Sequence, residues 1–231
     1  MPVQGQERLL LIPGHVGLAE DEVSLGIAQQ LSETVQTLRN LPGSFHYLFE
    51  ITAAHYHADY VLVDLSPGLG AINQNLVSTS DYFIVPASPD VFSVMAIDSL
   101  SRVLPGWVRW AQNAAQLEAL MYADYPFPTP GLKFLGTIVQ RYRLRSGEPT
   151  EAFRKYFDEL DLAISTSSLR WKKPGCCWIQ SATIGRTCKV HSGSLPYLIS
   201  IRLSLTRSRR ASRCLLLSRV TSGVAGSFGT G

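Results

Sequence analysis

Four short runs of apolar residues constrain most strongly what this chain can fold into. They cover residues 8–12, 60–64, 82–85 and 133–139, and longer amphipathic segments separate them. Strands that are apolar throughout are buried on both faces, which is typical of a parallel sheet covered by helices. Right-handed crossovers between such strands give a doubly wound arrangement. The sequence therefore predicts an α/β fold with three layers and a mainly parallel sheet.

Five helices are expected between and after these strands. Ser44 is predicted to cap the second helix, after a break at residues 41–43, and Ser88 is predicted to cap the fourth. The expected helices are residues 20–34, a helix from 44, residues 71–80, a helix from 88, and residues 151–160. Their predicted core-facing residues are Val23, Ile27 and Leu31; Phe45, Leu48, Phe49 and Thr52; Phe92, Met95, Ala96 and Val103; and Phe153, Tyr156, Phe157 and Leu160.

The charges divide the chain at Asp161. All 18 acidic residues lie at or before this position, whereas the last 70 residues hold 11 of the 21 lysines and arginines. Residues 1–161 therefore carry a net charge of −8 and residues 162–231 carry +11. Folded domains normally mix both signs of charge. We expect an ATPase-like body at 1–161 and an irregular, basic tail at 162–231.

The tail has three interpretations. Its arginines could form a nucleic-acid-binding arm that neutralises phosphates, it could pack as a small subdomain, or it could be translated out of frame. Residues 198–205 alternate like a strand, but no partner strand is expected, and the end of the chain is predicted to be disordered. The arginines proposed for the arm are Arg207, Arg209, Arg210 and Arg213.

Sequence features that bear on compartment are few. The four cysteines all lie in the tail, which leaves a cysteine-free body that suits a reducing compartment. No apolar run approaches the roughly 20 residues needed to span a bilayer, and no basic-then-apolar leader opens the chain. We expect a cytoplasmic protein without a membrane span.

The turn after the second apolar run is the main candidate site. Residues 60–64 deliver Asp64 at the end of a strand, and Ser66, Pro67 and Gly68 follow at once. An aspartate in this place can hold a magnesium-bound water, and the glycine allows close approach of a phosphate to the backbone. Asp64 could equally cap an ordinary turn. Because ligands bind beyond the carboxyl ends of parallel strands, Asp64, Pro86 and Gln140 are expected to share one crevice.

A longer pattern around this turn resembles the ParA/MinD class of partition ATPases. The segments are Asp64 to Gly70, then Asn75-Leu76, then residues 80–86, with residues 11–14 and 17–25 upstream. The resemblance covers about residues 8–160. It implies ATP and Mg²⁺ as cofactors, with Asp64 as the Walker B aspartate and Ser66-Pro67-Gly68 as the second switch. It also implies that Gln140 and Arg141 lie near the adenine.

The same resemblance implies partners and a missing part. In the family, ATP drives homodimerisation, and the dimer binds DNA or a partition-type partner protein. No Gly-Lys dipeptide occurs here, so the family's Lys-Gly-Gly-x-Gly-Lys-Thr phosphate loop is absent from this sequence. The chain is therefore expected to be an incomplete P-loop domain without ATP turnover. The alternatives are a non-catalytic interaction module, or a nucleic-acid-binding protein acting through the tail.

The basic run at residues 141–145 has two interpretations. It could contact phosphates or a DNA backbone, or it could be a solvated loop. The five histidines show no catalytic spacing, and no Gly-x-Ser-x-Gly motif supports serine hydrolase chemistry.

Overall fold

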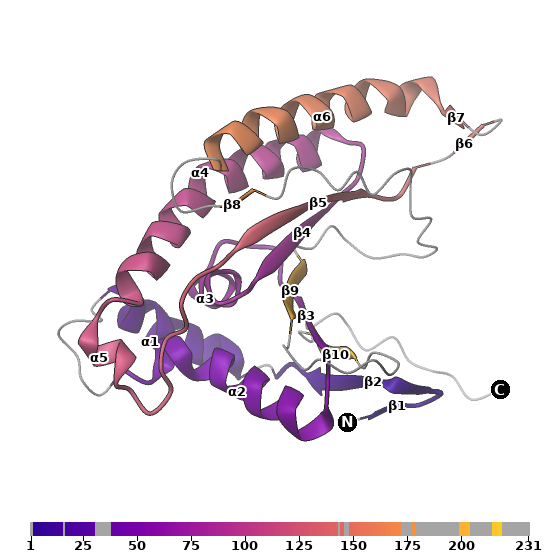
Figure 1. The fold of residues 1–231 in the computed structure, drawn as a ribbon. Helices are drawn as coiled ribbons and strands as arrows, with labels where there is room; N and C mark the ends of the chain where they lie inside the picture. The colour runs from indigo at the N-terminus through magenta and orange to yellow at the C-terminus, as the bar shows by residue number, and fades with distance from the viewer. Residues whose placement is uncertain are drawn as a thin grey trace.

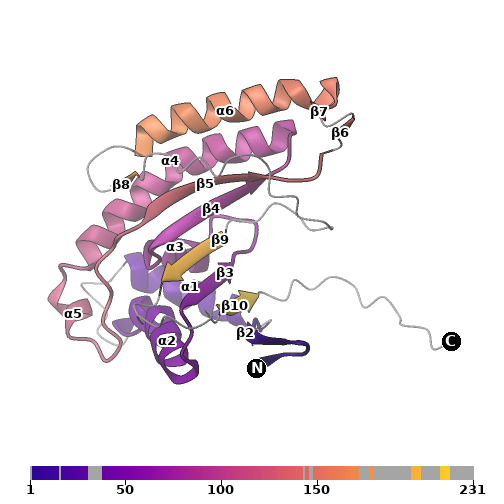
Figure 2. The same ribbon diagram turned by 45° about the vertical axis from the view of Figure 1, so that its right-hand side comes forward.

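A computed structural model (Figures 1 and 2) gives the fold of most of the chain. It describes residues 2–15, 17–30, 38–142, 144–145, 148–171, 177–178, 199–203 and 214–218. The elements described below lie within these ranges.

The centre of the fold is a sheet of eight strands in the order β1-β2-β10-β3-β9-β4-β5-β8. The pairings make β2, β10, β3, β4, β5 and β8 parallel, whereas β1 and β9 run the opposite way. The predicted mainly parallel sheet is confirmed. The strands are β1 (Pro2–Val3), β2 (Gln6–Pro13), β3 (Tyr60–Asp64), β4 (Tyr82–Ala87), β5 (Lys133–Val139), β8 (Cys177–Trp178), β9 (Ile199–Leu203) and β10 (Cys214–Ser218). A separate antiparallel pair joins β6 (Leu144–Arg145) to β7 (Glu148–Pro149).

The helices form two groups. In both views of the ribbon, α4 and α6 lie side by side along β4 and β5, while α1, α2 and α3 gather near β2 and β3 (Figures 1 and 2). Their bounds are α1 (Leu18–Gln30), α2 (Leu41–Tyr56), α3 (Ala71–Ser78), α4 (Val91–Ala114), α5 (Glu118–Met121) and α6 (Glu151–Trp171). One large cluster of buried side chains from these helices and from the strands forms the core.

Two helices begin at residues other than those predicted. Helix α2 starts after Asn40 and takes Pro42 into its first turn, where a proline loses no hydrogen bond. Ser44 therefore lies inside the helix, and its hydroxyl donates to the Leu41 carbonyl at 2.8 Å. Helix α4 is capped by Asp90, two residues after the predicted Ser88, because the Asp90 carboxylate accepts from the Ser93 N–H at 2.7 Å.

The predicted inward face of α1 is wrong. Val23 is 68% exposed and Ile27 is 42% exposed, whereas Leu25, Ala28 and Gln29 are buried. The helix is turned this way because it packs on α3 through small groups: a Cβ at Gly26 would lie 3.5 Å from that of Ala71. The third predicted core residue, Leu31, lies outside the described residues.

The predicted inward face of α4 is also wrong at its start. Phe92 is 76% exposed and Met95 is 60% exposed, and Ala96 is exposed as well. The cap turns Ser93 inward, so the buried stripe begins at Ser93 and continues through Ile97, Leu100 and Leu104. Val103, by contrast, packs against the core as predicted.

The other two helices keep most of their predicted faces. In α2, Phe49 is buried, Phe45 packs on the core and Thr52 is half-buried, but Leu48 is exposed. In α6, Leu160 is buried, and Phe153, Tyr156 and Phe157 are half-buried.

Helix α6 runs past the position where the apolar spacing was predicted to fail. It continues from Leu160 to Trp171, with Ala163 and Ile164 packed against the core and Ser167 buried. These positions continue the helical spacing of Leu160, and a serine replaces an apolar residue at the last of them. Because this stretch is mostly polar, its core-facing positions could not be recognised in the sequence.

Parts of the basic tail belong to the sheet, so the prediction of a wholly irregular tail is wrong. Strand β9 lies antiparallel between β3 and β4, and β10 lies parallel between β2 and β3. The alternating run at 198–205 thus has partners that are distant in sequence. The predicted nucleic-acid contacts Arg207, Arg209, Arg210 and Arg213 lie outside the described residues.

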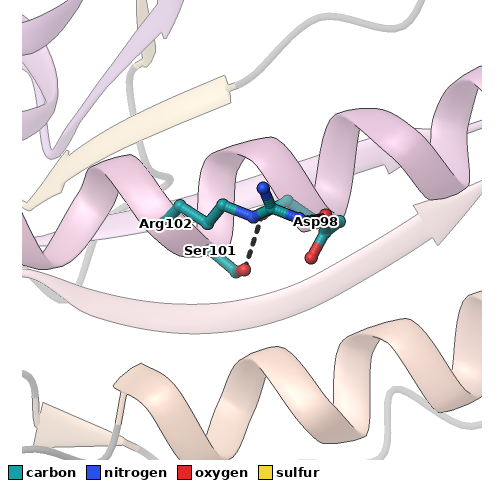
Figure 3. Close-up of polar contacts among 3 residues, drawn as sticks. All are labelled: Asp98, Ser101 and Arg102. Carbon is teal, nitrogen blue, oxygen red and sulfur yellow. Dashed lines mark hydrogen bonds and ion pairs between the residues drawn. The ribbon is translucent and has the colours of Figure 1, made fainter.

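Helix α4 has the length and composition of a membrane span, and no other helix in the described ranges does. Its inward stripe packs into the protein core, as in the core helix of a soluble domain. Its outer side carries an ion pair between Arg102 and Asp98, one turn apart (Figure 3), and the hydroxyl of Ser101 donates to the Asp98 carbonyl at 2.6 Å. These features favour a helix of the folded domain.

Candidate functional site

A small cavity lies beyond the carboxyl ends of β2 and β3, where the sequence predicts a site. Its volume is about 170 Å³. Strands β2 and β3 with the residues that follow them, together with helices α1, α2 and α3, supply its walls. The lining residues are Ile12, Pro13, Gly14, His15, Leu18, Phe45, Leu48, Asp64, Leu65, Ser66, Ile72, Asn73 and Leu76.

The cavity has an exposed edge and a buried floor. Pro13, His15 and Leu48 are exposed, whereas Leu65 and Ile72 are almost completely buried. Asp64 and Ser66 lie between these levels, each half-buried. Most of the lining is hydrocarbon, and none of the described residues that form it is a lysine or arginine.

Asn73 holds the turn after Asp64 in shape. Its buried side-chain amide donates to the Ser66 carbonyl at 2.7 Å and to the Gly68 carbonyl at 2.9 Å. The Ser66 hydroxyl in turn donates to Asn73 Oδ1 at 3.4 Å. The turn between β3 and α3 is therefore tied to the first turns of α3. Pro67 and Gly68 lie on the exposed outside of this turn.

Glu22 of α1 stabilises the start of α3. The α3 N-cap is Gly70, which has no side chain to accept from the free N–H groups. The Glu22 carboxylate takes that place with a long hydrogen bond of 3.5 Å from the Ile72 N–H. A negative charge at this end of a helix is also favourable for the helix dipole. The side-chain amide of Gln29 adds a second link from α1, to the Ala71 carbonyl at 3.1 Å.

Burial raises the pKa of the Asp64 carboxyl above its usual value of 3.8. The described residues offer this carboxylate no ion pair or hydrogen bond that would offset the loss of water. Asp64 is thus a half-buried, uncompensated acid at the edge of an apolar cavity.

Gln140 and Arg141 lie elsewhere on the same edge of the sheet. The Gln140 N–H donates to the Ala87 carbonyl at 2.9 Å, beside the end of β4, and Arg141 is exposed with a φ of +61°. Strand β9 separates β3 from β4, so Asp64 and Pro86 are about two strand spacings apart, roughly 10 Å. Of the predicted site residues, the cavity brings together Asp64 and Ser66, while Pro67, Gly68, Gln140 and Arg141 do not line it.

The cavity does not fit a magnesium nucleotide. Mg²⁺ is usually held by one or two carboxylates together with phosphate oxygens and waters, and Asp64 supplies one such carboxylate. The phosphates, however, would find no lysine or arginine among the lining residues that the structure describes. In the described part of the chain, no group of three or more His, Cys, Asp or Glu side chains could hold a metal ion. The volume is also below the 300–1,000 Å³ typical of ligand pockets.

Sequence reasoning missed three residues that shape this site: Glu22, Gln29 and Asn73. Asn73 sits three residues after Gly70, at a helix start, where a side-chain amide can reach back to a turn. That signal was present in the sequence. Glu22 and Gln29 act from a different helix, and nothing local in the sequence marks them.

Comparison with known families finds one match, which covers part of the chain. Residues 3–112 match a family model described as an AAA domain. The matched segment runs from β1 into the last turn of α4 and includes every residue that lines the cavity. The matched model belongs to a ParA/MinD-like P-loop ATPase family, whose domains are typically soluble and use a nucleotide, usually with Mg²⁺. No curated protein and no solved structure matches the chain.

Proposed function

From the ParA/MinD-like domain at residues 3–112, we propose that this chain is a partition-type ATPase domain that has the second switch but lacks ATP turnover. The observation that supports it is the cavity beside Asp64, which is small and apolar and has no lysine or arginine among its described lining residues. Asp64 keeps the place of a Walker B aspartate, and Ser66, Pro67 and Gly68 keep the switch turn. The groups that would hold a triphosphate opposite them are absent from the lining.

The proposal includes the finer features implied by the resemblance. The fold is three-layered and doubly wound. The chain acts in the cytoplasm in a plasmid- or chromosome-partition system. There it forms dimers with itself or a relative, and it contacts DNA or a partition partner protein. The order of motifs from residue 11 to residue 86 supports this role.

Equilibrium binding of Mg²⁺-ATP tests the nucleotide part of the proposal. Calorimetric titration of the 231-residue chain should give no saturable binding at millimolar nucleotide. Saturable binding that is lost in Asp64→Ala but retained in Asp98→Ala, an exposed carboxylate on α4, would contradict the proposal.

A non-catalytic interaction module is the second candidate, because apolar side chains are exposed at the start of α4. Val91, Phe92 and Met95 are all exposed there, and Leu69 of the switch turn is 50% exposed. Large apolar side chains grouped on a surface are typical of a protein contact. If this surface pairs with an intact ParA-type ATPase, Phe92→Ser should weaken co-sedimentation with it, whereas Tyr122→Ser, equally exposed, should not. Equal effects of both substitutions would remove this candidate.

A further inference from the structure

The cavity beside Asp64 is an apolar space that is open at one edge, and Asp64 lies at that edge. Its floor is made by Leu65, Ile72 and Leu76, and the ring of Phe45 belongs to its wall. Asp64 is the one acidic residue of the lining, and the described residues give its carboxylate no counter-charge. A ligand that fills this space must therefore make apolar contacts on most sides and a favourable polar contact with a carboxylate on one side.

Size limits what can enter. An apolar cavity of about 150 Å³ lined by leucine, isoleucine and phenylalanine side chains stays dry and takes up one benzene molecule. At about 170 Å³, the present cavity has room for a single aromatic ring or a short branched hydrocarbon chain. Nucleotides and peptides of several residues are excluded by volume.

Charge limits the chemistry further. A wholly apolar ligand would displace water from the half-buried Asp64 carboxylate without replacing the lost hydrogen bonds, which is costly. An anionic ligand would be repelled by Asp64 and would meet no arginine or lysine in the described part of the lining. A cationic group satisfies the carboxylate by a charge-assisted hydrogen bond and also interacts favourably with an aromatic ring such as that of Phe45.

We infer that this cavity is a binding site for a small primary amine with an aromatic or branched hydrocarbon body. The hydrocarbon fills the space over Leu65, Ile72 and Leu76, and the ammonium group donates to the Asp64 carboxylate. Ser66, two residues further along the chain, also lines the cavity. This inference goes beyond the proposed ATPase ancestry, and it holds whether or not the chain binds a nucleotide.

Benzylamine tests this site on the full 231-residue chain. The methyl resonances of Ile12, Ile72 and Leu76 are followed by NMR during titration, with benzyl alcohol and benzoate as compounds of the same size. Benzylamine should shift these resonances saturably in the millimolar range. Benzyl alcohol should bind at least 10-fold more weakly, since a hydrogen bond between charged groups is worth about twofold more than a neutral one, and benzoate should not bind.

Variants separate the charge from the shape of the cavity. Asp64→Asn keeps the volume of the cavity and should weaken the binding of benzylamine about 10-fold or more. The affinity for benzyl alcohol should be unchanged, which would also show that the cavity is intact. Asp98→Asn, an exposed carboxylate on α4, should change neither titration. The inference is overturned if benzoate binds as well as benzylamine, if Asp64→Asn leaves benzylamine binding unchanged, or if no compound shifts the methyl resonances.

Discussion

The turns that follow β3 and β4 have similar sequences but are stabilised in different ways. After β4, the cap is local: the Asp90 carboxylate accepts from the Ser93 N–H, and the Ser93 hydroxyl accepts from the Ser88 N–H at 3.0 Å. After β3, helix α3 begins at Gly70, which has no capping side chain, and the Ile72 N–H in its first turn donates to Glu22 from α1. The β4 turn is specified by neighbours in sequence, and Asn73 holds the β3 turn in the same local way. The start of α3 after the β3 turn, by contrast, depends on a contact 50 residues away.

This difference indicates where ligand binding can be coupled to the movement of another helix. A turn that caps itself keeps its shape whatever the rest of the domain does. A turn that is capped from another helix changes when that helix moves, so a ligand there can be coupled to α1. In this protein the candidate site, with Asp64 and its cavity, lies on the second kind of turn.

The largest expected effect comes from removing the amide that holds the β3 turn. Asn73→Ala removes two hydrogen bonds from a buried side chain and should lower the free energy of unfolding by about 2 kcal/mol. Chemical denaturation measures this loss, and Asn113→Ala, exposed on α4, serves as the control with almost no change. If both variants are equally stable, Asn73 does not hold the turn.

The next effect tests the contact between α1 and α3. A Cβ at residue 70 would overlap Glu22 Oε1, so Gly70→Ala should cost about 1.5 kcal/mol by displacing the carboxylate that caps α3. Gly131→Ala is the control, because an added Cβ there meets nothing within 4 Å. In a Glu22→Ala background the cost of Gly70→Ala should nearly vanish, and an unchanged cost in that background would argue against the contact.

A smaller and purely local effect is expected at the β4 turn. Asp90→Ala removes an N-cap side chain and should cost about 1 kcal/mol. In contrast with Gly70→Ala, its effect should be independent of Glu22, as thermal unfolding of the single and double variants can show. Coupling between Asp90 and Glu22 would mean that the two turns are not separate.

The smallest effect concerns the charge of Asp64. Since burial raises the pKa of Asp64 above 3.8, the folded state holds this proton more tightly than the unfolded chain. The contribution of this tighter proton binding to the free energy of unfolding is fully present below pH 3.8. It is lost as the pH rises through the raised pKa of Asp64 in the folded state. Asp64→Asn should therefore be slightly more stable than the parent at pH 7, and the difference should disappear at about pH 3. A less stable variant at pH 7 would indicate a carboxylate with a favourable partner.

The same contrast between local and distant contacts explains which parts of the fold could be predicted from the sequence. The runs at 60–64 and 133–139 became β3 and β5 at the same residues, because a run that is apolar throughout has few structures other than a buried strand. The exposed faces of α1 and α4 could not be predicted, since close packing at Gly26 and the orientation of Ser93 decided them. The strand-like alternation at 198–205 was recognised, but the pairing of β9 was not, because its partners β3 and β4 lie more than 100 residues away.

For the site, the sequence predicted the strand end and the turn but not the enclosure. Asp64 and Ser66 are marked by their place after an apolar strand. The cavity itself is formed by Leu18, Phe45 and Ile72, which come from three different helices. Its small volume and its lack of a lysine or arginine follow from that tertiary arrangement.

Release of inorganic phosphate from Mg²⁺-ATP is the most direct test of the central claim that the β3 turn is an ATPase switch without a phosphate-binding partner. The purified 231-residue chain is compared with Asp64→Ala under the same conditions. We expect the same background rate from both proteins. Turnover by the parent chain that is lost in Asp64→Ala would contradict the claim.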